Sequence, residues 1–147
     1  MELTTAKITI CGGGNGAQTL VPIAACNLGC AVDLYAPFGD EAARLQAGIT
    51  THGGLKTTGA VRSSARPRWI SADPAQVLPG SEVVVLVLPA FAHESTLRQI
   101  VPFLDEGAWV GAMPARGGFD SGSLVCLRLE AKSQKNEGQD RRKDHGD

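Results

Sequence analysis

The chain has 147 residues, which suits one domain, and its 43% hydrophobic and 20% charged residues are ordinary for a globular protein. With a formal net charge of −1 and only 5% aromatic residues, neither charge nor base stacking favours nucleic acid or an anionic membrane as a partner. The sequence shows no signal peptide, and its apolar runs are shorter than the roughly 18 residues of a membrane span. We therefore expect a cytoplasmic protein with no nucleic-acid or membrane partner.

The four cysteines indicate neither a disulfide framework nor a metal site. Cys11, Cys26, Cys30 and Cys126 form no C-x-x-C pair, and no histidine stands at metal-ligand spacing from them. We expect reduced cysteines that act as small hydrophobic residues, as in a cytosolic protein, and no bound metal.

Strands and helices alternate in the first half of the chain. β-Branched residues predict a strand over residues 7–11, and apolar residues at helical spacing predict a helix over 17–28, which Pro22 should bend. A second strand is predicted over 30–36 and a short helix over 41–47. Residues 48–68 indicate short strands joined by turns rather than a helix.

The second half continues the alternation. Asp73 and Pro74 form the start signature of a short helix, and residues 83–88 are continuously apolar, which is typical of a parallel strand buried on both faces. A helix over 93–104 and a strand over 109–113 follow. This order predicts an α/β fold with a doubly wound, Rossmann-type parallel sheet over residues 1–120. Residues 121–147 carry few apolar residues, and we expect a disordered tail there.

A glycine-rich segment separates the first predicted strand from the first predicted helix. Gly12, Gly14 and Ala17 match G-x-G-x-x-G/A, in which the glycines permit a tight turn and close approach to a pyrophosphate. The N–H groups at the helix start would bind the phosphates. The sequence therefore predicts a site for NADP or NAD. It is formed by Gly12, Gly13, Gly14, Asn15, Gly16 and Ala17. A glycine turn that merely packs the helix on the sheet is the alternative.

The end of the second predicted strand bears on the choice between NAD and NADP. An NAD site usually carries an acid there, about 20 residues beyond the loop, for the ribose 2′-hydroxyl. Ala36 stands where we expect this acid, and we place it beside the cofactor. Asp33 lies inside the strand, and Asp40 lies beyond a turn. Losing the acid removes repulsion against a 2′-phosphate, which Arg44 could reach, so the sequence favours NADP with NAD as the alternative.

Two further segments follow strands at the sheet edge where ligands bind in such folds. Pro89, Ala90 and Phe91 are expected to line the path of the ribose and the nicotinamide. We expect His93, at the start of a helix, to orient or cap rather than to act in catalysis. Arg116 is a candidate contact for an anionic ligand and, equally, for a salt bridge within its loop.

Four segments together resemble a known family. They are ICGGGNGA, TTGAV, SADPAQVLPGSEVVVLVLPAFAHESTLRQIVPFL and GAWVGAMPARGGF, within residues 7–120. They are similar to the amino-terminal cofactor domain of the opine (octopine/nopaline) dehydrogenases, within the 6-phosphogluconate dehydrogenase-like superfamily.

The resemblance implies an oxidoreductase that joins an amino acid to an α-keto acid, with hydride passing from NADH or NADPH to the imine carbon. It also implies that the catalytic His–Asp pair lies in a carboxyl-terminal helical domain, which we expect to be absent from this chain. Catalytic residues are therefore left unassigned. The substrates implied are small molecules, and a homo-oligomer is possible. A stand-alone NAD(P)-binding regulatory module, or a gene fragment without catalysis, is the alternative.

Overall fold

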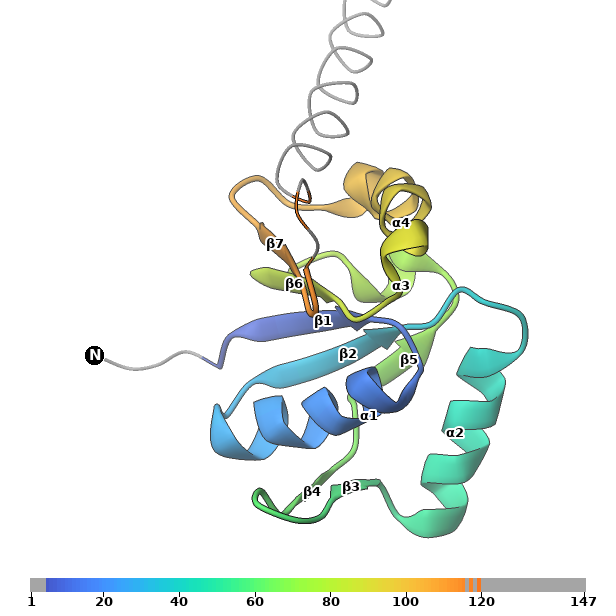
Figure 1. Cartoon of the computed structure of the whole chain (residues 1–147), viewed down its shortest axis with the longest axis vertical. Helices are drawn as coiled ribbons and strands as arrows, with labels where there is room; N and C mark the ends of the chain where they lie inside the picture. Colours follow the sequence, from blue (N-terminus) through green and yellow to red (C-terminus); the bar gives the residue numbers. More distant parts are fainter. Residues whose placement is uncertain (1–4, 116, 118, 120–147) are drawn as a thin grey trace, which may run out of the picture.

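The computed structural model describes residues 5–115, 117 and 119, and a parallel sheet of five strands runs through this part of the chain (Figure 1). In spatial order the strands are β5 (Trp69–Ser71), β2 (Ala31–Tyr35), β1 (Lys7–Cys11), β6 (Val83–Leu86) and β7 (Trp109–Ala112). Each neighbouring pair is parallel. The chain starts at the centre, builds one half and returns to build the other, as the prediction of a doubly wound sheet requires.

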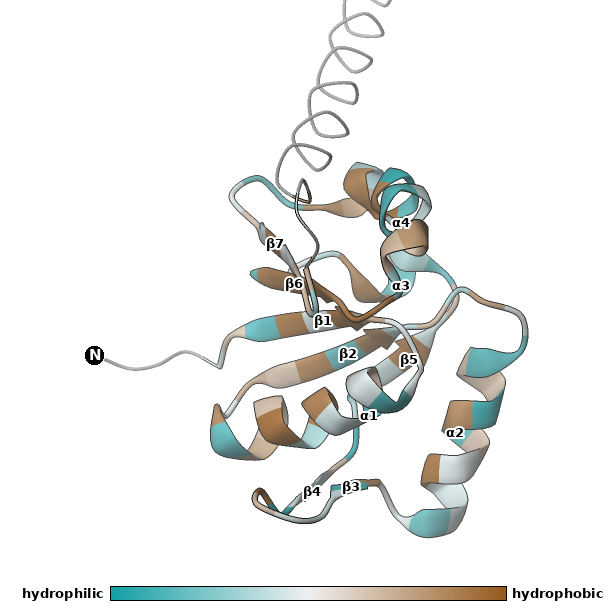
Figure 2. Ribbon diagram, viewed as in Figure 1, coloured by the Kyte–Doolittle hydropathy of each residue, from teal (hydrophilic) through white to brown (hydrophobic). Residues whose placement is uncertain are grey.

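Helices cover both faces of the sheet (Figure 1). They are α1 (Asn15–Pro22), a π-helical turn (Ile23–Asn27), α2 (Glu41–His52), α3 (Pro74–Val77), a 3₁₀ turn (Ala90–Ala92), α4 (His93–Ile100) and a 3₁₀ turn (Val101–Phe103). The face that carries Ile10 and Leu34 packs against α1, and the face that carries Cys11 and Leu86 packs against α3 and α4. Successive strand residues alternate between these faces, so each strand contributes to both cores. Figure 2 shows strand β6 mostly in brown, the colour of hydrophobic residues.

Strand β6 is parallel to both of its neighbours, as its apolar run predicts. Val84 and Leu86 are fully buried, but Val83 and Val85 are only half-buried. The expectation that β6 is buried on both faces was therefore wrong. Among the described residues, the face that carries Val83 and Val85 is only partly covered. No helix among the described residues is long and apolar enough to cross a membrane.

The first helix differs from its prediction in bounds and geometry. It begins at Asn15 and, after Pro22, widens into a π-helical turn that ends at Asn27. Proline has no N–H to continue the hydrogen-bond ladder, and a widened turn accommodates this break.

The second helix is longer than predicted. It runs to His52, so the expectation of strands was wrong for residues 48–52. Ile49 lies one turn after Leu45 and is only 4% exposed, and its burial outweighs the poor helix propensity of Gly48. The helix ends at Gly53, whose φ of 81° is a left-handed conformation that suits glycine.

The segment after α2 otherwise forms the short strands that the sequence predicts. Strands β3 (Leu55–Thr57) and β4 (Ser63–Ala65) pair antiparallel as a hairpin, and β5 joins the main sheet. The predicted start of α3 is confirmed, because the Asp73 carboxylate accepts a hydrogen bond from the Ala75 N–H at 2.9 Å.

The described cysteines are free thiols in different environments. Cys11 is fully buried on β1, and this burial raises the pKa of its thiol to about 12. The unfolded chain would ionise this thiol near pH 9.0, whereas the folded chain keeps its proton to about pH 12. The contribution of Cys11 to stability is therefore complete below pH 9.0 and is lost as the pH rises toward 12.

Alkylation should separate Cys11 from Cys26. Iodoacetamide at pH 8 is expected to modify Cys26, which is exposed, and to leave Cys11 unmodified because its thiol is buried and protonated. Peptide mass spectrometry reports each cysteine separately, and the same reaction in denaturant provides the control in which Cys11 reacts. Rapid native labelling of Cys11 would contradict its place in the core.

Candidate functional site: the glycine loop and its two cavities

The glycine loop, residues 12–17, joins the end of β1 to the first turn of α1. Gly12 has a φ of 129°, and a Cβ added to it would lie 2.5 Å from the Val87 carbonyl oxygen, just beyond β6. Both the backbone conformation and the close approach require glycine. The Gly12 N–H donates to the Tyr35 carbonyl at 2.8 Å. The loop is therefore held between the ends of β2 and β6.

The later loop positions combine an open approach with tight packing. A Cβ added to Gly14 meets no atom of the described chain within 4 Å, whereas a Cβ added to Gly16 would lie 2.9 Å from Val87 Cγ1. Ala17 is fully buried in the core between α1 and the sheet. Gly12, Gly14 and Ala17 thus have the geometry that G-x-G-x-x-G/A requires: a tight turn, an open approach and a close helix–sheet contact.

The start of α1 fits the pyrophosphate of a dinucleotide. Gly14 precedes the helix and has no side chain to cap it, and the first turn contains no acidic residue. The first N–H groups of a helix lack partners within the helix and favour an anion. Gln18 Nε2 donates to the Gly13 carbonyl at 2.8 Å, which fixes the loop from within the helix. An anion approaching Gly14 would therefore meet helix N–H groups, with the chain neighbours of Gly14 left aside, and no other described atom within 4 Å of an added Cβ.

A cavity of about 620 Å³ opens beside the loop at the ends of β6 and β7. Its lining consists of Gly16, Val87, Leu88, Pro89, Ala90, Phe91, Met113 and Pro114. The structure thus brings the predicted residues Pro89, Ala90 and Phe91 together with Gly16 of the loop. The Phe91 side chain is 88% exposed at this cavity, so it is available to a ligand or to another domain.

His93 has a structural environment in the described part of the chain. It is buried at the start of α4, its Nε2 lies 3.0 Å from the Leu88 carbonyl oxygen, and its ring meets Phe119 edge-on at 5.3 Å. These contacts tie the start of α4 to the segment that lines the cavity. They suit the orienting role expected for His93.

The residues considered for the choice between NAD and NADP differ in burial. Ala36 follows β2, is fully buried, and donates its N–H to the Ser71 carbonyl at 2.9 Å. Asp33 is also fully buried. Arg44 is exposed, and its Nε lies 3.0 Å from Asp40 Oδ1. Arg116 and the tail expected over residues 121–147 lie outside the described residues.

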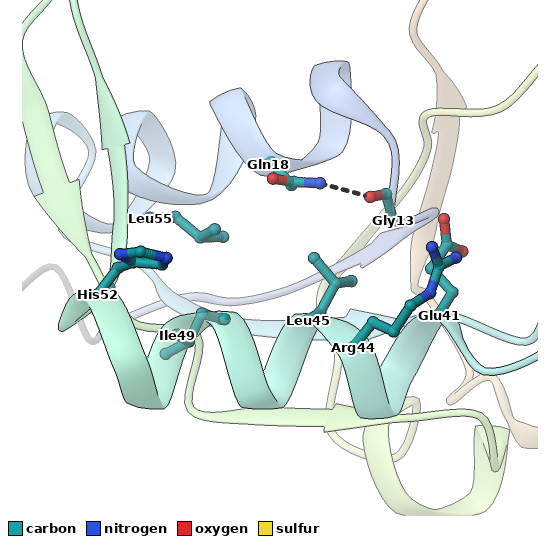
Figure 3. A pocket seen from close by; sticks show the side chains of 10 residues that line it. Gly13, Gln18, Glu41, Arg44, Leu45, Ile49, His52 and Leu55 are labelled. Carbon is teal, nitrogen blue, oxygen red and sulfur yellow. Dashed lines mark hydrogen bonds between the residues drawn. The ribbon is translucent and has the colours of Figure 1, made fainter.

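A second cavity of about 430 Å³ lies on the other side of the loop, between α1 and α2 (Figure 3). Gly13 and Glu41 lie at one end, and His52 lies at the other. Leu45 and Ile49 from α2 and Leu55 from β3 add apolar lining.

Sequence reasoning did not include Glu41 in the site, because it was assigned only to the start of a short helix. A signal was present: the turn at Gly39 reverses the chain after β2, so an acid just beyond it returns toward the glycine loop. Among the described residues, no group of three His, Cys, Asp or Glu side chains could hold a metal ion.

The strand order and the glycine loop define a Rossmann-type dinucleotide-binding fold. No family model matches the chain. Octopine dehydrogenase of Pecten maximus is 35% identical over 125 residues, which cover 79% of this chain and 30% of that protein. Opine dehydrogenase of Haliotis discus hannai is 33% identical over 138 residues, which cover 87% of this chain and 34% of that protein.

Solved structures of octopine dehydrogenase show the same fold. The structure with NADH and pyruvate has a TM-score of 0.73 and 32% identity, and the match covers 84% of this chain and 33% of that one. Over most of its length the chain is similar to a portion of the opine dehydrogenases, as the resemblance implies. It spans about a third of the length of these relatives.

Proposed function

We propose that this chain is the cofactor-binding domain of an opine-dehydrogenase-type oxidoreductase and that its glycine loop holds the pyrophosphate of NAD(H). The observation that carries this proposal is the open approach at Gly14, directly before the uncapped start of α1. An anion placed there meets helix N–H groups in a fold used for dinucleotides. The homologous octopine dehydrogenase was solved with NADH, which favours this cofactor.

The two cavities suit the two ends of the dinucleotide. The cavity lined by Pro89, Ala90 and Phe91 would take the nicotinamide, and the cavity between α1 and α2 would take the adenosine. The bound nicotinamide supplies a hydride, which in this family is passed to an imine of an amino acid and an α-keto acid. This chain's residues hold and orient the ring: apolar side chains exclude water, and His93 positions the segment at Leu88.

The catalytic step itself requires a further domain. Phe91 and Met113 are 88% and 55% exposed at the nicotinamide cavity, and such apolar side chains suit burial under another domain. We therefore assign the amino acid, the keto acid and the catalytic pair to the portion of the relatives that this chain does not match. The same exposed side chains would also suit a partner protein, as the alternative of a regulatory module requires.

Calorimetric titration tests the proposed site directly. NADH is expected to bind the chain with a Kd on the order of micromolar, about −8 kcal/mol. Pyruvate and arginine should cause no NADH oxidation by the chain alone, and oxidation should appear when a helical domain of a relative is supplied. Absence of NADH binding would contradict the cofactor site, and turnover by the isolated chain would contradict the assignment of catalysis elsewhere.

A further inference from the structure

Glu41 has a carboxylate for which the fold alone gives no reason. Its Oε2 is buried and has no hydrogen-bond partner among the described residues. Buried polar atoms in proteins are nearly always paired, and an unpaired one indicates a cost or a missing ligand. Glu41 belongs to the first turn of α2, where its charge is favourable, but this does not explain why the side chain turns inward.

The Glu41 side chain lies against the centre of the glycine loop. A Cβ added to Gly13 would lie 2.6 Å from Glu41 Cγ and 2.7 Å from Glu41 Oε1. Gly13 is the variable position between Gly12 and Gly14 in the motif, so pyrophosphate binding alone does not require a glycine there. This glycine instead leaves room for the carboxylate, and Figure 3 shows Glu41 and Gly13 at the same end of the cavity.

Glu41 lies where it can act as the ribose-binding acid that is missing at Ala36. In this fold the ribose of the adenosine half lies between the glycine loop and the end of β2, where an acid usually binds its hydroxyls. The chain leaves β2, turns, and returns at Glu41, whose N–H donates to the Phe38 carbonyl at 3.1 Å. The carboxylate thereby reaches the loop from the first turn of α2 rather than from the strand.

We infer that Glu41 binds the hydroxyls of the adenosine ribose and makes this site selective for NAD(H) over NADP(H). The inference rests on the proposed function. A carboxylate accepts hydrogen bonds from the ribose 2′- and 3′-hydroxyls and repels a phosphate at the 2′ position. The apolar side chains of Leu45, Ile49 and Leu55 in the same cavity provide a surface for the adenine.

Arg44 is the competing determinant, because a cation at this cavity would favour a 2′-phosphate. Its Nε is paired with Asp40 Oδ1 at 3.0 Å, and both side chains are largely exposed. An exposed pair one turn apart is typical of a helix surface. Glu41, whose Oε2 is buried and whose Oε1 lies against Gly13 of the loop, is therefore the determinant that the geometry favours.

The test is a comparison of NADH and NADPH affinity by calorimetry in the full chain. The unaltered chain is expected to bind NADH at least about tenfold more tightly than NADPH. Glu41→Gln should weaken NADH binding by about tenfold, because a charge-assisted hydrogen bond is lost, and should strengthen NADPH binding. Arg44→Gln should change the affinity for each cofactor by less than about threefold.

Glu94→Gln is the matched control, since Glu94 is the acid in the first turn of α4 and pairs with Arg98 on the surface. It should leave both affinities unchanged. Glu41→Asp keeps the charge, and its shorter reach should give an intermediate ratio, which tests the inference if Glu41→Gln folds poorly.

Equal or tighter binding of NADPH by the unaltered chain overturns the inference, as does an equal effect of Glu41→Gln on both cofactors. Failure of the unaltered chain to bind either cofactor contradicts the proposed function itself, and the inference with it.

Discussion

Replacing Gly14 with valine is expected to abolish NADH binding while the domain stays folded. Apart from the two chain neighbours, no described atom lies within 4 Å of a Cβ added to Gly14, so the fold leaves room for the new side chain. Gly14 has φ −75° and ψ −177°, which valine adopts readily. The loss of stability should be about 1 kcal/mol or less, as for a poorer helix cap. Affinity for NADH should fall more than about a hundredfold, since two charge-assisted hydrogen bonds are worth roughly 3–6 kcal/mol.

Gly12→Ala is the matched control in the same loop. Its main effect should be on the stability of the fold, whereas the main effect of Gly14→Val should be on NADH affinity. Its Cβ would lie 2.5 Å from the Val87 carbonyl oxygen at a φ of 129°. Strain and overpacking together should lower the free energy of unfolding by about 3 kcal/mol. Urea unfolding and NADH titration of both variants separate the two roles. Tight NADH binding by folded Gly14→Val would contradict the proposed pyrophosphate site.

Local patterns predicted the fold because each central element carries its own signal. Strand β1 is β-branched, β6 is an unbroken apolar run, and the start of α3 is capped by Asp73. The errors occur where tertiary burial outweighs propensity. The predicted helix stopped at residue 47, yet burial of Ile49 carries α2 to His52. A pattern read over one turn cannot report a contact with a distant strand.

The glycine loop could be predicted because its geometry is encoded in consecutive residues. The cavity beside Gly13 could not be predicted, because its lining depends on the path by which the chain returns to the loop after β2. A site acid was expected at Ala36, counted along the sequence from the loop. In the structure the carboxylate near the loop comes from Glu41, which lies beyond a turn. Counting residues along a strand cannot predict where the chain lies after such a turn.

Asp33 is the other acid of this region, and its environment is that of a residue that stabilises the fold. It is fully buried on β2, where its carboxylate lies 3.2 Å from Lys7 Nζ and accepts two hydrogen bonds of 3.1 Å from Arg68. These bonds raise the pKa of the Arg68 guanidinium. Lys7 begins β1, whereas the glycine loop follows the end of that strand. The ion pair therefore lies away from the cofactor edge and ties β1 to β2 and to the residue before β5.

Asp33→Asn should consequently lower stability without altering cofactor choice. The substitution removes the carboxylate beside Lys7, which is 13% exposed but still donates to the Val77 and Pro79 carbonyls, so the cost should be about 2–3 kcal/mol. Arg68→Gln is the comparison: its side chain is 51% exposed and Asp33 keeps Lys7, but the buried Asp33 Oδ1 loses the Arg68 Nε donor, so the cost should be about 1–3 kcal/mol. Urea unfolding measures both, and titration of the folded variants should give an unchanged ratio of NADH to NADPH affinity. A changed ratio in Asp33→Asn would place this carboxylate, rather than that of Glu41, at the ribose.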